Sequence, residues 1–398
     1  MQRESEFRLI MAIINRVGPP VEGGDFFGRE KELREANKKL DAGLSLLLSA
    51  PRRIGKSSFA KRLIEDKKSL GWKCVYVDLE EVRDENGFVQ LIVNSFSDNQ
   101  LLRKTDEGLS QGLSKALDKF KSISIGGIIS LDIKDRDEQE NLYGCLKNLM
   151  VHKEKTLVVM DELTLFLNVL RKTEGGEGKV SYILNWLRGF RQVSGTEIRW
   201  LFCGSVGLRN FTSMLNLSYT INDLDEFHID ALSETEAKGL LKGLSAGASI
   251  ELNDDIIDLI LGKLQWYIPY FIQVVFSKIV EEAETKVTPQ IVDSAYDGLC
   301  SEKYLSTWSE RLTEYGEYEM LARKLLALLC MNPAGFEREN LLNDVMIGKN
   351  ATEYDACSLA LSKVLSMLEN DGYILKKGPI RTFRSPLLRD YWYRKFIE

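Results

Sequence analysis

The segment from Leu44 to Ser69 constrains the fold of this chain more than any other part of the sequence. Leu44–Ser49 is mostly apolar, as expected for a strand that is buried on both faces. A loop that contains proline and glycine follows, and the residues from Lys56 to about Ser69 favour a helix. A strand, a loop and a helix in this order form the unit from which parallel sheets are built. The segment therefore predicts an α/β domain.

Further apolar runs support this prediction. Strands are expected at Lys73–Leu79, Thr156–Met160 and Ile198–Cys203, and helical sequence lies between the strands. Continuous apolar strands that alternate with helices indicate a parallel sheet covered on both faces, over about residues 25–230. Before the third strand, Lys121–Lys134 alternates apolar and polar residues around Gly126 and Gly127, which predicts an inserted hairpin.

The C-terminal part of the chain reads as helical. Ser233 and Glu236 have the spacing of a capping box, and helical periods follow at residues 254–264, 267–284 and 289–299. Near the end of the chain three helical segments precede a hairpin around Gly378 and Pro379, which is the order of a winged helix. We therefore expect an N-terminal arm (1–24), an α/β core (25–230), a helical lid (231–305) and a winged-helix domain (306–398).

The composition excludes several classes of protein. With 398 residues, 44% hydrophobic and 28% charged, the chain is a globular protein long enough for more than one core. Its net charge of -6 gives no general attraction for nucleic acid. Six cysteines without a C-x-x-C pair and only two histidines, His152 and His228, argue against a zinc site. No signal peptide or membrane span is recognisable, so we expect a cytoplasmic protein without a membrane partner.

The loop after the first strand has the spacing of a phosphate-binding loop, with Ala50 where the pattern usually has its first glycine. Backbone N–H groups of the loop and of the following helix would surround the phosphates of a nucleotide. Lys56 would contact the β and γ phosphates, and Ser57 would hold Mg²⁺. An ordinary Gly-Lys-Ser turn is the alternative, which the flanking strand and helix disfavour. The candidate residues are Ala50, Pro51, Arg52, Arg53, Ile54, Gly55, Lys56, Ser57 and Ser58.

Two carboxylates end another apolar strand. Asp161 and Glu162 follow Leu157–Met160, and open parallel sheets bind ligands at the carboxyl ends of their strands. Asp161 would order Mg²⁺ through water, and Glu162 could polarise the water that attacks the nucleotide. A solvated acidic pair that only closes a strand is the alternative, and the agreement of strand, spacing and loop disfavours it.

With these motifs the chain resembles the archaeal-type P-loop ATPase family, which is close to the AAA+ and STAND nucleotide switches. Phe27–Leu33 is similar to the family's adenine-side box, Phe202–Ser205 to its sensor-1 strand end, and Tyr267–Pro269 to an element of its helical lid. Glu369–Tyr373 and Arg384–Tyr391 are similar to its C-terminal winged helix.

The resemblance implies a fold, a ligand and a set of site residues. The fold is a P-loop NTPase parallel sheet of the AAA+/STAND type, followed by a helical lid and a C-terminal winged helix. The ligand is ATP or ADP with Mg²⁺. The implied residues are Phe27, Gly28, Arg29 and Pro269 with the loop for the nucleotide, Glu162, Lys56 and Ser205 for catalysis, and Ser57 with Asp161 for the metal.

Two features depart from the family's pattern. Relatives often have a Gly-Arg pair before the lid, where this chain has Tyr219–Leu224. The lid helix at Pro269 offers no obvious sensor arginine, so slow hydrolysis is expected. Arg188 and Arg191 are the substitute candidates for an arginine finger donated to a neighbouring subunit, and a solvated helix face is the alternative for both.

The expected winged helix does not suit the reading of DNA. Its third helix begins near Glu353 with acidic residues, which would face phosphates. The hairpin carries Lys376, Lys377, Arg381 and Arg384, which could hold a DNA backbone without reading bases. A charged, solvated hairpin is the alternative. On charge grounds we favour contact with a protein or an autoinhibitory role.

The sequence thus predicts a Mg²⁺-dependent, slow ATPase that acts as a switch and signals to a protein partner or through self-assembly. A DNA-associated ATPase, such as an origin-recognition-like or transposition-type loader, is the main alternative, and the basic hairpin favours it. A nucleotide-binding protein that no longer hydrolyses is the third, and the missing lid arginine favours it.

Overall fold

The computed structural model describes residues 12–98, 154–204 and 207–398. The hairpin expected at Lys121–Lys134 lies outside the described residues, as do Ser205, Cys145 and His152. The chain forms two compact units. The sheet unit comprises Glu30–Ser49 and Phe59–Ile229, and the lid-wing unit comprises Met1–Arg29, Ala50–Ser58 and Asp230–Glu398. The division into four parts expected from the sequence stays a prediction.

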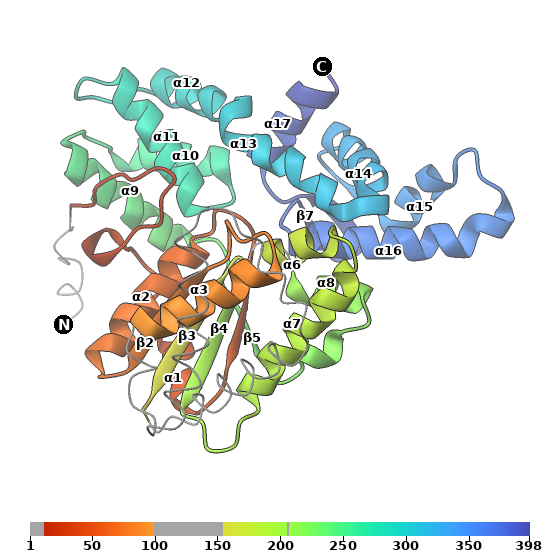
Figure 1. Ribbon diagram of the computed structural model, residues 1–398. Coiled ribbons are helices and arrows are strands. Elements are labelled where there is room, and N and C mark those ends of the chain that lie inside the picture. The colour runs from red at the N-terminus through yellow and green to blue at the C-terminus, as the bar shows by residue number, and fades with distance from the viewer. Residues whose placement is uncertain (1–11, 99–153, 205–206) are drawn as a thin grey trace, which may run out of the picture. The chain divides into compact units, whose positions relative to one another are not determined.

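Five parallel strands form the sheet of the sheet unit (Figure 1). They are β1 (Leu46–Ser49), β2 (Lys73–Asp78), β3 (Thr156–Asp161), β4 (Ile198–Gly204) and β5 (Asp225–His228), in the order β2-β3-β4-β1-β5. The four strands expected from the sequence and their parallel arrangement are confirmed. The fifth, β5, was not expected because Phe227 is its only buried residue. It is an edge strand, which needs only one buried face.

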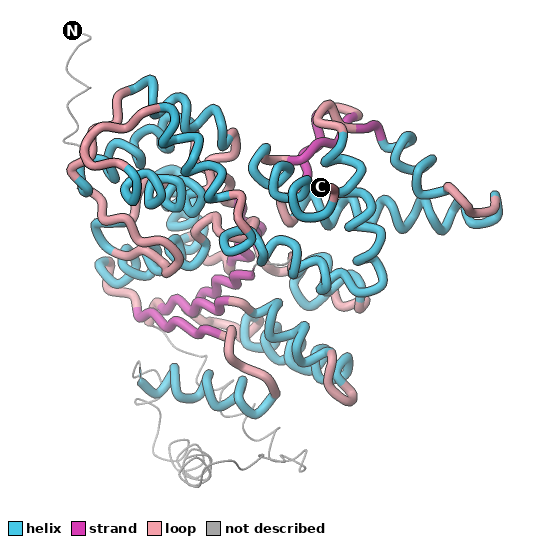
Figure 2. The backbone as a smooth tube through the Cα atoms, turned by 90° about the horizontal axis from the view of Figure 1, so that it is seen from above, coloured by secondary structure: helices cyan, strands magenta, loops and turns pink. Residues whose placement is uncertain are grey.

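Helices lie on both sides of this sheet (Figure 2). They are α1 (Glu30–Asp41), α2 (Lys56–Ser69), α3 (Glu85–Asp98), α6 (Leu163–Arg171), α7 (Gly176–Arg191), α8 (Leu208–Met214) and the short 3-10 helix η2 (Ser218–Ile221). All six residues of β3 are buried, which explains its continuous apolar sequence.

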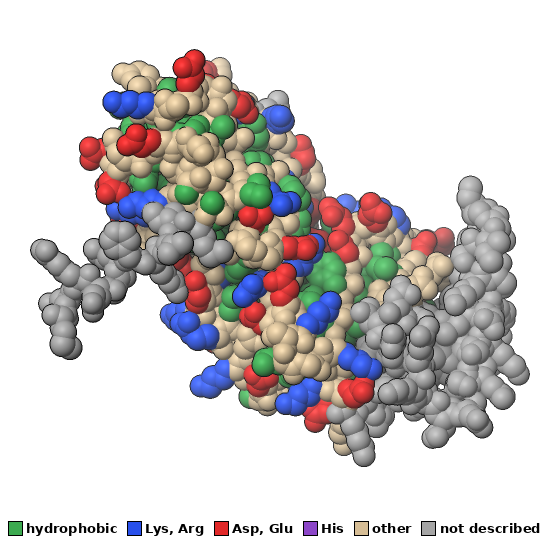
Figure 3. Space-filling model, turned by 90° about the vertical axis from the view of Figure 1, so that its left-hand side faces the viewer, with side chains coloured by type: hydrophobic (Ala, Val, Ile, Leu, Met, Phe, Trp, Pro, Cys, Tyr) green, Lys and Arg blue, Asp and Glu red, His purple; other side chains and the backbone are tan. Residues whose placement is uncertain are grey.

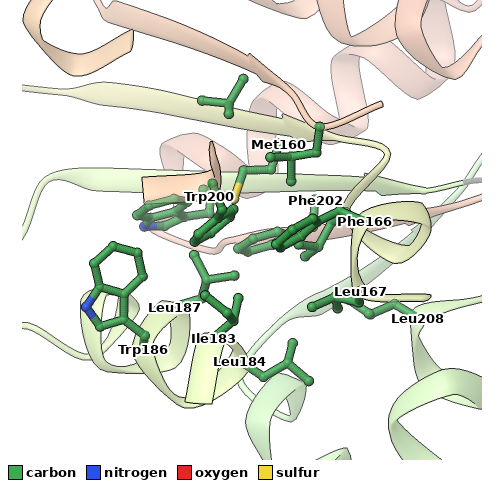
Figure 4. Close-up of a cluster of buried hydrophobic side chains, with 14 of the residues drawn as sticks. Met160, Phe166, Leu167, Ile183, Leu184, Trp186, Leu187, Trp200, Phe202 and Leu208 are labelled. Carbon is green, nitrogen blue, oxygen red and sulfur yellow. The ribbon is translucent and has the colours of Figure 1, made fainter. Parts of the chain in front are cut away.

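The core of the sheet unit fixes the strand that ends in Asp161. Alternate residues of a strand point to opposite faces of its sheet. On one face, Met160, Trp200 and Phe202 lie against Phe166 of α6 and Leu187 of α7 (Figure 4). These side chains are at most 1% exposed, and each contributes about 1.5–3 kcal/mol by its burial. The end of β3 is therefore held on a rigid layer.

The lid-wing unit contains four lid helices: α9 (Glu234–Ala248), α10 (Asp254–Leu264), α11 (Pro269–Glu282) and α12 (Pro289–Leu299). The capping box expected at Ser233 is present. The Ser233 hydroxyl accepts from the Glu236 N–H at 3.2 Å, and the Glu236 carboxylate accepts from the Ser233 N–H at 2.8 Å. Asn253 and Thr288 cap α10 and α12, so three of these helices begin where their sequences predict.

The winged-helix part follows in the same unit. Its helices are α13 (Glu302–Glu310), the 3-10 segment η3 (Arg311–Tyr318), α14 (Glu319–Met331), α15 (Arg338–Met346), the 3-10 turn η4 (Ala351–Glu353), α16 (Tyr354–Asn370) and α17 (Pro386–Phe396). The short 3-10 turn η1 (Gly23–Asp25) lies in the N-terminal segment of the same unit. Strands β6 (Phe336–Glu337), β7 (Ile374–Lys377) and β8 (Ile380–Phe383) form an antiparallel sheet. Helices α14, α15 and α16 precede the hairpin of β7 and β8, which confirms the expected winged-helix arrangement. No helix among the described residues is both long and apolar enough to cross a membrane.

Candidate functional site

The loop from Ala50 to Gly55 joins β1 to α2, as the sequence predicts. Gly55 has a φ of +96°, a left-handed conformation that suits glycine, and no atom lies within 4 Å of the place where its Cβ would be. Ala50, which replaces the usual glycine, does not have a positive φ, so its methyl group causes no backbone strain. The strained position is Arg53, which has a φ of 63°.

The lysine of the loop holds the loop together. The Lys56 ammonium donates to the carbonyl oxygens of Ala50 at 3.1 Å and Pro51 at 3.0 Å, and the residue is only 7% exposed. Lys56 and Ser57 begin α2, whose first turn contains no acidic residue. A helix N-terminus with its positive dipole end, a lysine and no nearby carboxylate on its first turn suits a phosphate group.

Three residues outside the loop fix its position within the lid-wing unit. The Arg29 guanidinium donates to the Ile54 carbonyl at 3.3 Å. The Val21 N–H donates to the Ser58 hydroxyl at 3.0 Å. The Arg53 guanidinium lies 4.4 Å from the centre of the Tyr270 ring, which directly follows Pro269 at the start of α11. The loop thus contacts both the N-terminal segment and the lid.

Phe27, Gly28 and Arg29 lie against α9. The Arg29 N–H donates to the Glu236 carboxylate at 3.1 Å, and Arg29 is 4% exposed. Burial would raise the pKa of Glu236, but hydrogen bonds from Ser233 and Arg29 outweigh this effect and lower the pKa below its ordinary value. The capping carboxylate of α9 therefore also holds the segment that contacts the phosphate-binding loop.

A row of glycines on α9, which we did not anticipate from the sequence, makes this packing possible. A Cβ on Gly239 would lie 2.7 Å from the Phe27 ring, and one on Gly247 would lie 2.2 Å from the Ile13 carbonyl oxygen. Between them, the Gly243 carbonyl accepts from the Ile13 N–H at 3.0 Å. The spacing of four residues is the signal that could have identified this helix face.

The two candidate acidic residues lie in the sheet unit, at the end of β3. Asp161 is 2% exposed. One of its carboxylate oxygens accepts from the Tyr76 hydroxyl at 2.6 Å, and the other accepts from the Glu162 N–H at 3.0 Å. Burial and the neighbouring Asp161 charge raise the pKa of Tyr76 far above its usual range, so the phenol is a hydrogen-bond donor. Sequence reasoning missed Tyr76.

Glu162 turns the chain from β3 into α6. It precedes α6 with a φ of 55° and a ψ of 29°, a left-handed conformation that is uncommon for a residue with a side chain. Non-glycine residues in this conformation cluster at functional sites. The conformation therefore supports a special role for this residue, beyond closing the strand.

The structure does not support Arg191 as an arginine finger. Its side chain is 3% exposed and donates to both carboxylate oxygens of Asp223, at 2.7 and 2.9 Å, and to the Thr220 carbonyl at 2.6 Å. Burial would raise the pKa of Asp223, but Arg191 lowers it. These contacts hold the Arg191 guanidinium against η2, so it is not available to a neighbouring subunit. Arg188 lies 5.5 Å from the centre of the Tyr219 ring.

Two of the four basic residues of the winged-helix hairpin are engaged within their own unit. Arg384 pairs with Asp230 at 2.7 Å and lies 4.9 Å from the centre of the Trp266 ring. Arg381 lies 3.5 Å from the Glu369 carboxylate and is largely buried. Lys376 and Lys377 are exposed. On the face shown in Figure 3, basic and acidic side chains are interspersed.

The turn between α16 and β7 contacts the phosphate-binding loop, a further feature that sequence reasoning missed. Gly372 has a φ of +84°, and a Cβ there would lie 3.0 Å from the Pro51 side chain and 2.7 Å from the Trp266 ring. Only glycine fits this close approach. The signal for it in the sequence is the Asp-Gly pair that ends α16.

Beside this turn, Asp371 forms a buried ion pair. Its carboxylate accepts from the Arg311 guanidinium at 3.0 Å and from the Tyr315 hydroxyl at 2.8 Å. Burial raises the pKa of Asp371, against the opposing effects of Arg311, of the Tyr315 hydrogen bond and of the positive charges of Lys56 and Arg52. Two cations of the loop therefore act electrostatically on a carboxylate of the winged helix.

Comparison with known proteins shows the fold. No protein-family model and no curated protein sequence matches the chain. Among solved structures, it is similar to the Walker-type ATPase PABY2304 of Pyrococcus abyssi, with a TM-score of 0.64 and 16% identity over 95% of this chain and 99% of that one. It is also similar to the ORC2 protein of Aeropyrum pernix, solved as ADPNP–ADP complexes, with a TM-score of 0.51 and 14% identity over 93% and 94%. The resemblance to archaeal P-loop ATPases expected from the sequence is confirmed in the fold.

Proposed function

We propose that this chain binds ATP with Mg²⁺, hydrolyses it slowly, and works as a nucleotide-controlled switch that a protein partner reads. The loop geometry supports nucleotide binding, because a helix N-terminus, Lys56 and a left-handed glycine come together in it. The similar fold of a protein described as a Walker-type ATPase supports the same ligand. The DNA-associated alternative gains no support from Arg381 and Arg384, which have acidic partners.

Each candidate residue has a role in this proposal. Lys56 binds the β and γ phosphates, while Phe27, Gly28, Arg29 and Pro269 contribute to holding the nucleotide. Ser57 supplies a hydroxyl ligand to the metal and Asp161 holds one of its waters. Glu162 orients and deprotonates the attacking water. Ser205, which lies outside the described residues, is proposed as a further catalytic residue.

The proposed metal is Mg²⁺, which suits oxygen ligands such as a hydroxyl and a carboxylate. Among the described residues, no group of three or more histidine, cysteine or acidic side chains could enclose an ion. Mg²⁺ commonly takes one or two protein oxygens and completes its shell with water and substrate phosphates. A single hydroxyl and a single carboxylate suit that mode of binding. The metal would neutralise charge on the phosphates during hydrolysis.

The contact between Gly372 and Pro51 is the observation that carries the switch. It joins the phosphate-binding loop to the winged helix within one unit, so a change in the loop reaches the winged helix directly. Phosphates bound to the loop would offset the charges of Lys56 and Arg52, which now favour the charged form of Asp371. We therefore expect ATP to weaken the contact of the winged helix with the loop.

We also propose that the protein works in the cytoplasm, as expected from the sequence. Five cysteines are described, all are buried, and none forms a disulfide: Cys74, Cys203, Cys300, Cys330 and Cys357. Reduced, buried thiols are typical of proteins in a reducing compartment. This supports a role in the cytoplasm.

Titration calorimetry tests the proposal. We expect wild-type protein to bind ATP, and Lys56→Ala to lose about 2–4 kcal/mol of binding free energy with the lost charge pair. Lys68→Ala, on the exposed surface of the same helix, is the matched control and should bind as the wild type does. Equal ATP affinities of Lys56→Ala and Lys68→Ala would contradict the proposed binding of phosphate by the loop.

A further inference from the structure

Strand β2 brings the polar side chain of Tyr76 close to the end of β3. The two strands run parallel, with Tyr76 opposite Val159 and Asp78 opposite Asp161. Tyr76 and Asp161 therefore lie on the same face of the sheet as diagonal neighbours, a separation that a long aromatic side chain can span. The phenol reaches Asp161 because of this register.

The contact is short and partly buried. The Tyr76 hydroxyl donates to one Asp161 oxygen at 2.6 Å, a distance typical of a bond to a charged carboxylate. The other oxygen accepts from the Glu162 N–H. Hydrogen bonds on both oxygens restrict rotation of the carboxylate about its own axis. The Lys61 ammonium lies 5.9 Å from the centre of the Tyr76 ring, so α2 borders the tyrosine as well.

Strand pairing alone does not require this hydroxyl. β2 and β3 are already joined along six pairs of residues, Lys73 with Thr156 through Asp78 with Asp161. A phenylalanine at position 76 would keep the packing of the ring. The hydroxyl adds only the bond to Asp161, the residue to which the proposed function assigns the metal-bound water.

We propose that Tyr76 is a positioning residue, which holds the Asp161 carboxylate in the orientation that the hydrated Mg²⁺ of MgATP requires. This inference rests on the proposed function. It assigns a second layer of hydrogen bonding to the metal site, of the kind that orients the ligands of metals in proteins.

The test is the Mg²⁺ dependence of nucleotide binding, measured without turnover. A fluorescent ATP analogue is titrated into wild type and Tyr76→Phe, first with EDTA and then at increasing Mg²⁺ concentrations. We expect equal affinities in EDTA, because the phosphate-binding loop is unchanged. The Mg²⁺ concentration for the half-maximal effect should rise about tenfold or more in Tyr76→Phe, the usual effect of losing an outer hydrogen bond at a metal site.

A matched control separates positioning from folding. Tyr296 also donates to an aspartate, Asp390, at 2.8 Å, and burial raises its pKa as it does for Tyr76. Tyr296→Phe therefore removes the same kind of bond far along the chain from Asp161. It should leave the Mg²⁺ dependence at the wild-type value. Thermal melting of both variants shows whether either is unfolded.

The outcomes distinguish this inference from the proposed function. Wild type that binds no nucleotide in EDTA or Mg²⁺ contradicts the proposed function itself. Wild type that binds, with the same Mg²⁺ dependence in Tyr76→Phe, contradicts only the role of Tyr76. Equal shifts in Tyr76→Phe and Tyr296→Phe would show a general effect on stability, and the positioning role would be wrong.

Discussion

At the scale of single residues, two of the candidate residues with left-handed backbone conformations, Arg53 and Glu162, lie at turns that follow strands. Arg53 has a φ of 63° in the loop, and Glu162 has a φ of 55° at the end of β3. Each such residue costs about 1 kcal/mol relative to a relaxed backbone. Both lie where the chain passes from a strand toward a helix. The fold accepts this cost at two turns that the proposed function uses.

Two substitutions of Glu162 separate the energetic cost of its left-handed backbone from its proposed role as the catalytic base. Glu162→Gln and Glu162→Gly both lose the proposed base, so both should bind ATP and turn it over about 100-fold more slowly. Because glycine adopts a positive φ freely, the glycine variant should melt at no lower temperature than the glutamine variant. Single-turnover rates and thermal melting measure the two effects. Unchanged turnover in Glu162→Gln would exclude Glu162 as the base.

Some candidate residues could be identified from the sequence and others could not. Lys56 and Asp161 belong to short motifs that adjoin apolar strands, so local sequence is enough to find them. Tyr76 depends on the register between two strands separated by a long stretch of chain. Gly372 depends on a contact with Pro51, more than 300 positions away. The Asp-Gly pair at residues 371 and 372 indicates a turn, but no local pattern indicates its contact with Pro51 or the contact of Tyr76 with Asp161.

At the scale of elements, the start of α9 combines a helix cap with a tertiary contact. Glu236 accepts from the Ser233 N–H, as a capping box requires, and also from the Arg29 N–H. A local motif thus fixes the segment that donates to the loop at Ile54. The stability of the helix and the position of the loop depend on one carboxylate.

This carboxylate predicts a dependence of stability on pH. The pKa of Glu236 is lower in the folded protein than in the unfolded chain, so its charge stabilises the fold above the ordinary value of about 4.3. That stabilisation is lost as the pH falls through the lowered pKa. Glu236→Gln should therefore melt below wild type at pH 7, as expected for a lost cap worth about 1 kcal/mol.

The difference between Glu236→Gln and wild type should shrink as the pH is lowered below about 4.3. Glu234→Gln is the matched control, because Glu234 lies in the first turn of the same helix and is exposed. Differential scanning fluorimetry across this pH range gives both comparisons. A constant difference for Glu236→Gln at every pH would contradict the role of the charge.

The elements also show what sequence patterns can predict. Strands β1 to β4 are buried, apolar and bounded by turns, so their sequences predicted them. Strand β5, with the sequence Asp-Glu-Phe-His, forms because its backbone pairs with β1. Burial of Phe227 alone is too weak a signal for a strand. Tertiary pairing decides such short edge segments.

At the scale of the whole molecule, the switch depends on the contact of the winged helix with the loop. Gly372→Ala introduces a Cβ that would lie 2.7 Å from Trp266 and 3.0 Å from Pro51. Gly378→Ala is the matched control, because Gly378 also has a positive φ, +60°, but nothing lies within 4 Å of its Cβ position. Both variants carry a backbone cost of about 1 kcal/mol.

We expect only Gly372→Ala to release a fluorescent ADP analogue faster than wild type, because only this substitution pushes the turn away from the loop. Stopped-flow fluorescence measures the release rates. Limited proteolysis should also cut the winged-helix part of Gly372→Ala faster, and ATP should have the same effect on wild type. Identical release rates in the two alanine variants would show that the turn does not control the loop.

The whole molecule also allows a prediction about DNA. With Arg381 and Arg384 engaged, the hairpin offers Lys376 and Lys377 for binding to phosphates. We expect weak duplex binding, with a Kd of about 10⁻⁴ to 10⁻⁶ M, that ATP barely changes. Replacing both lysines with alanine should make the slope of log K against log salt concentration less steep. The slope should change by about 0.9 for each phosphate that a lysine no longer neutralises.

Fluorescence anisotropy at several salt concentrations checks this expectation. Lys31 and Lys38, which are exposed on α1, give a control variant with the same change of net charge. Tight binding that requires ATP, and that only the hairpin substitutions abolish, would make the DNA-associated function the better proposal.

The unit to which the phosphate-binding loop belongs determines how the protein can be divided into fragments. The loop belongs to the lid-wing unit, although the residues before and after it belong to the sheet unit. A fragment that ends at Ile229 would contain every residue of the two nucleotide motifs. It would nevertheless lack Tyr270 beneath Arg53, Glu236 beneath Arg29 and Gly372 beside Pro51. The shortest piece of this chain able to keep its loop in shape therefore extends through the winged helix, and motif boundaries are a poor guide to where it can be cut.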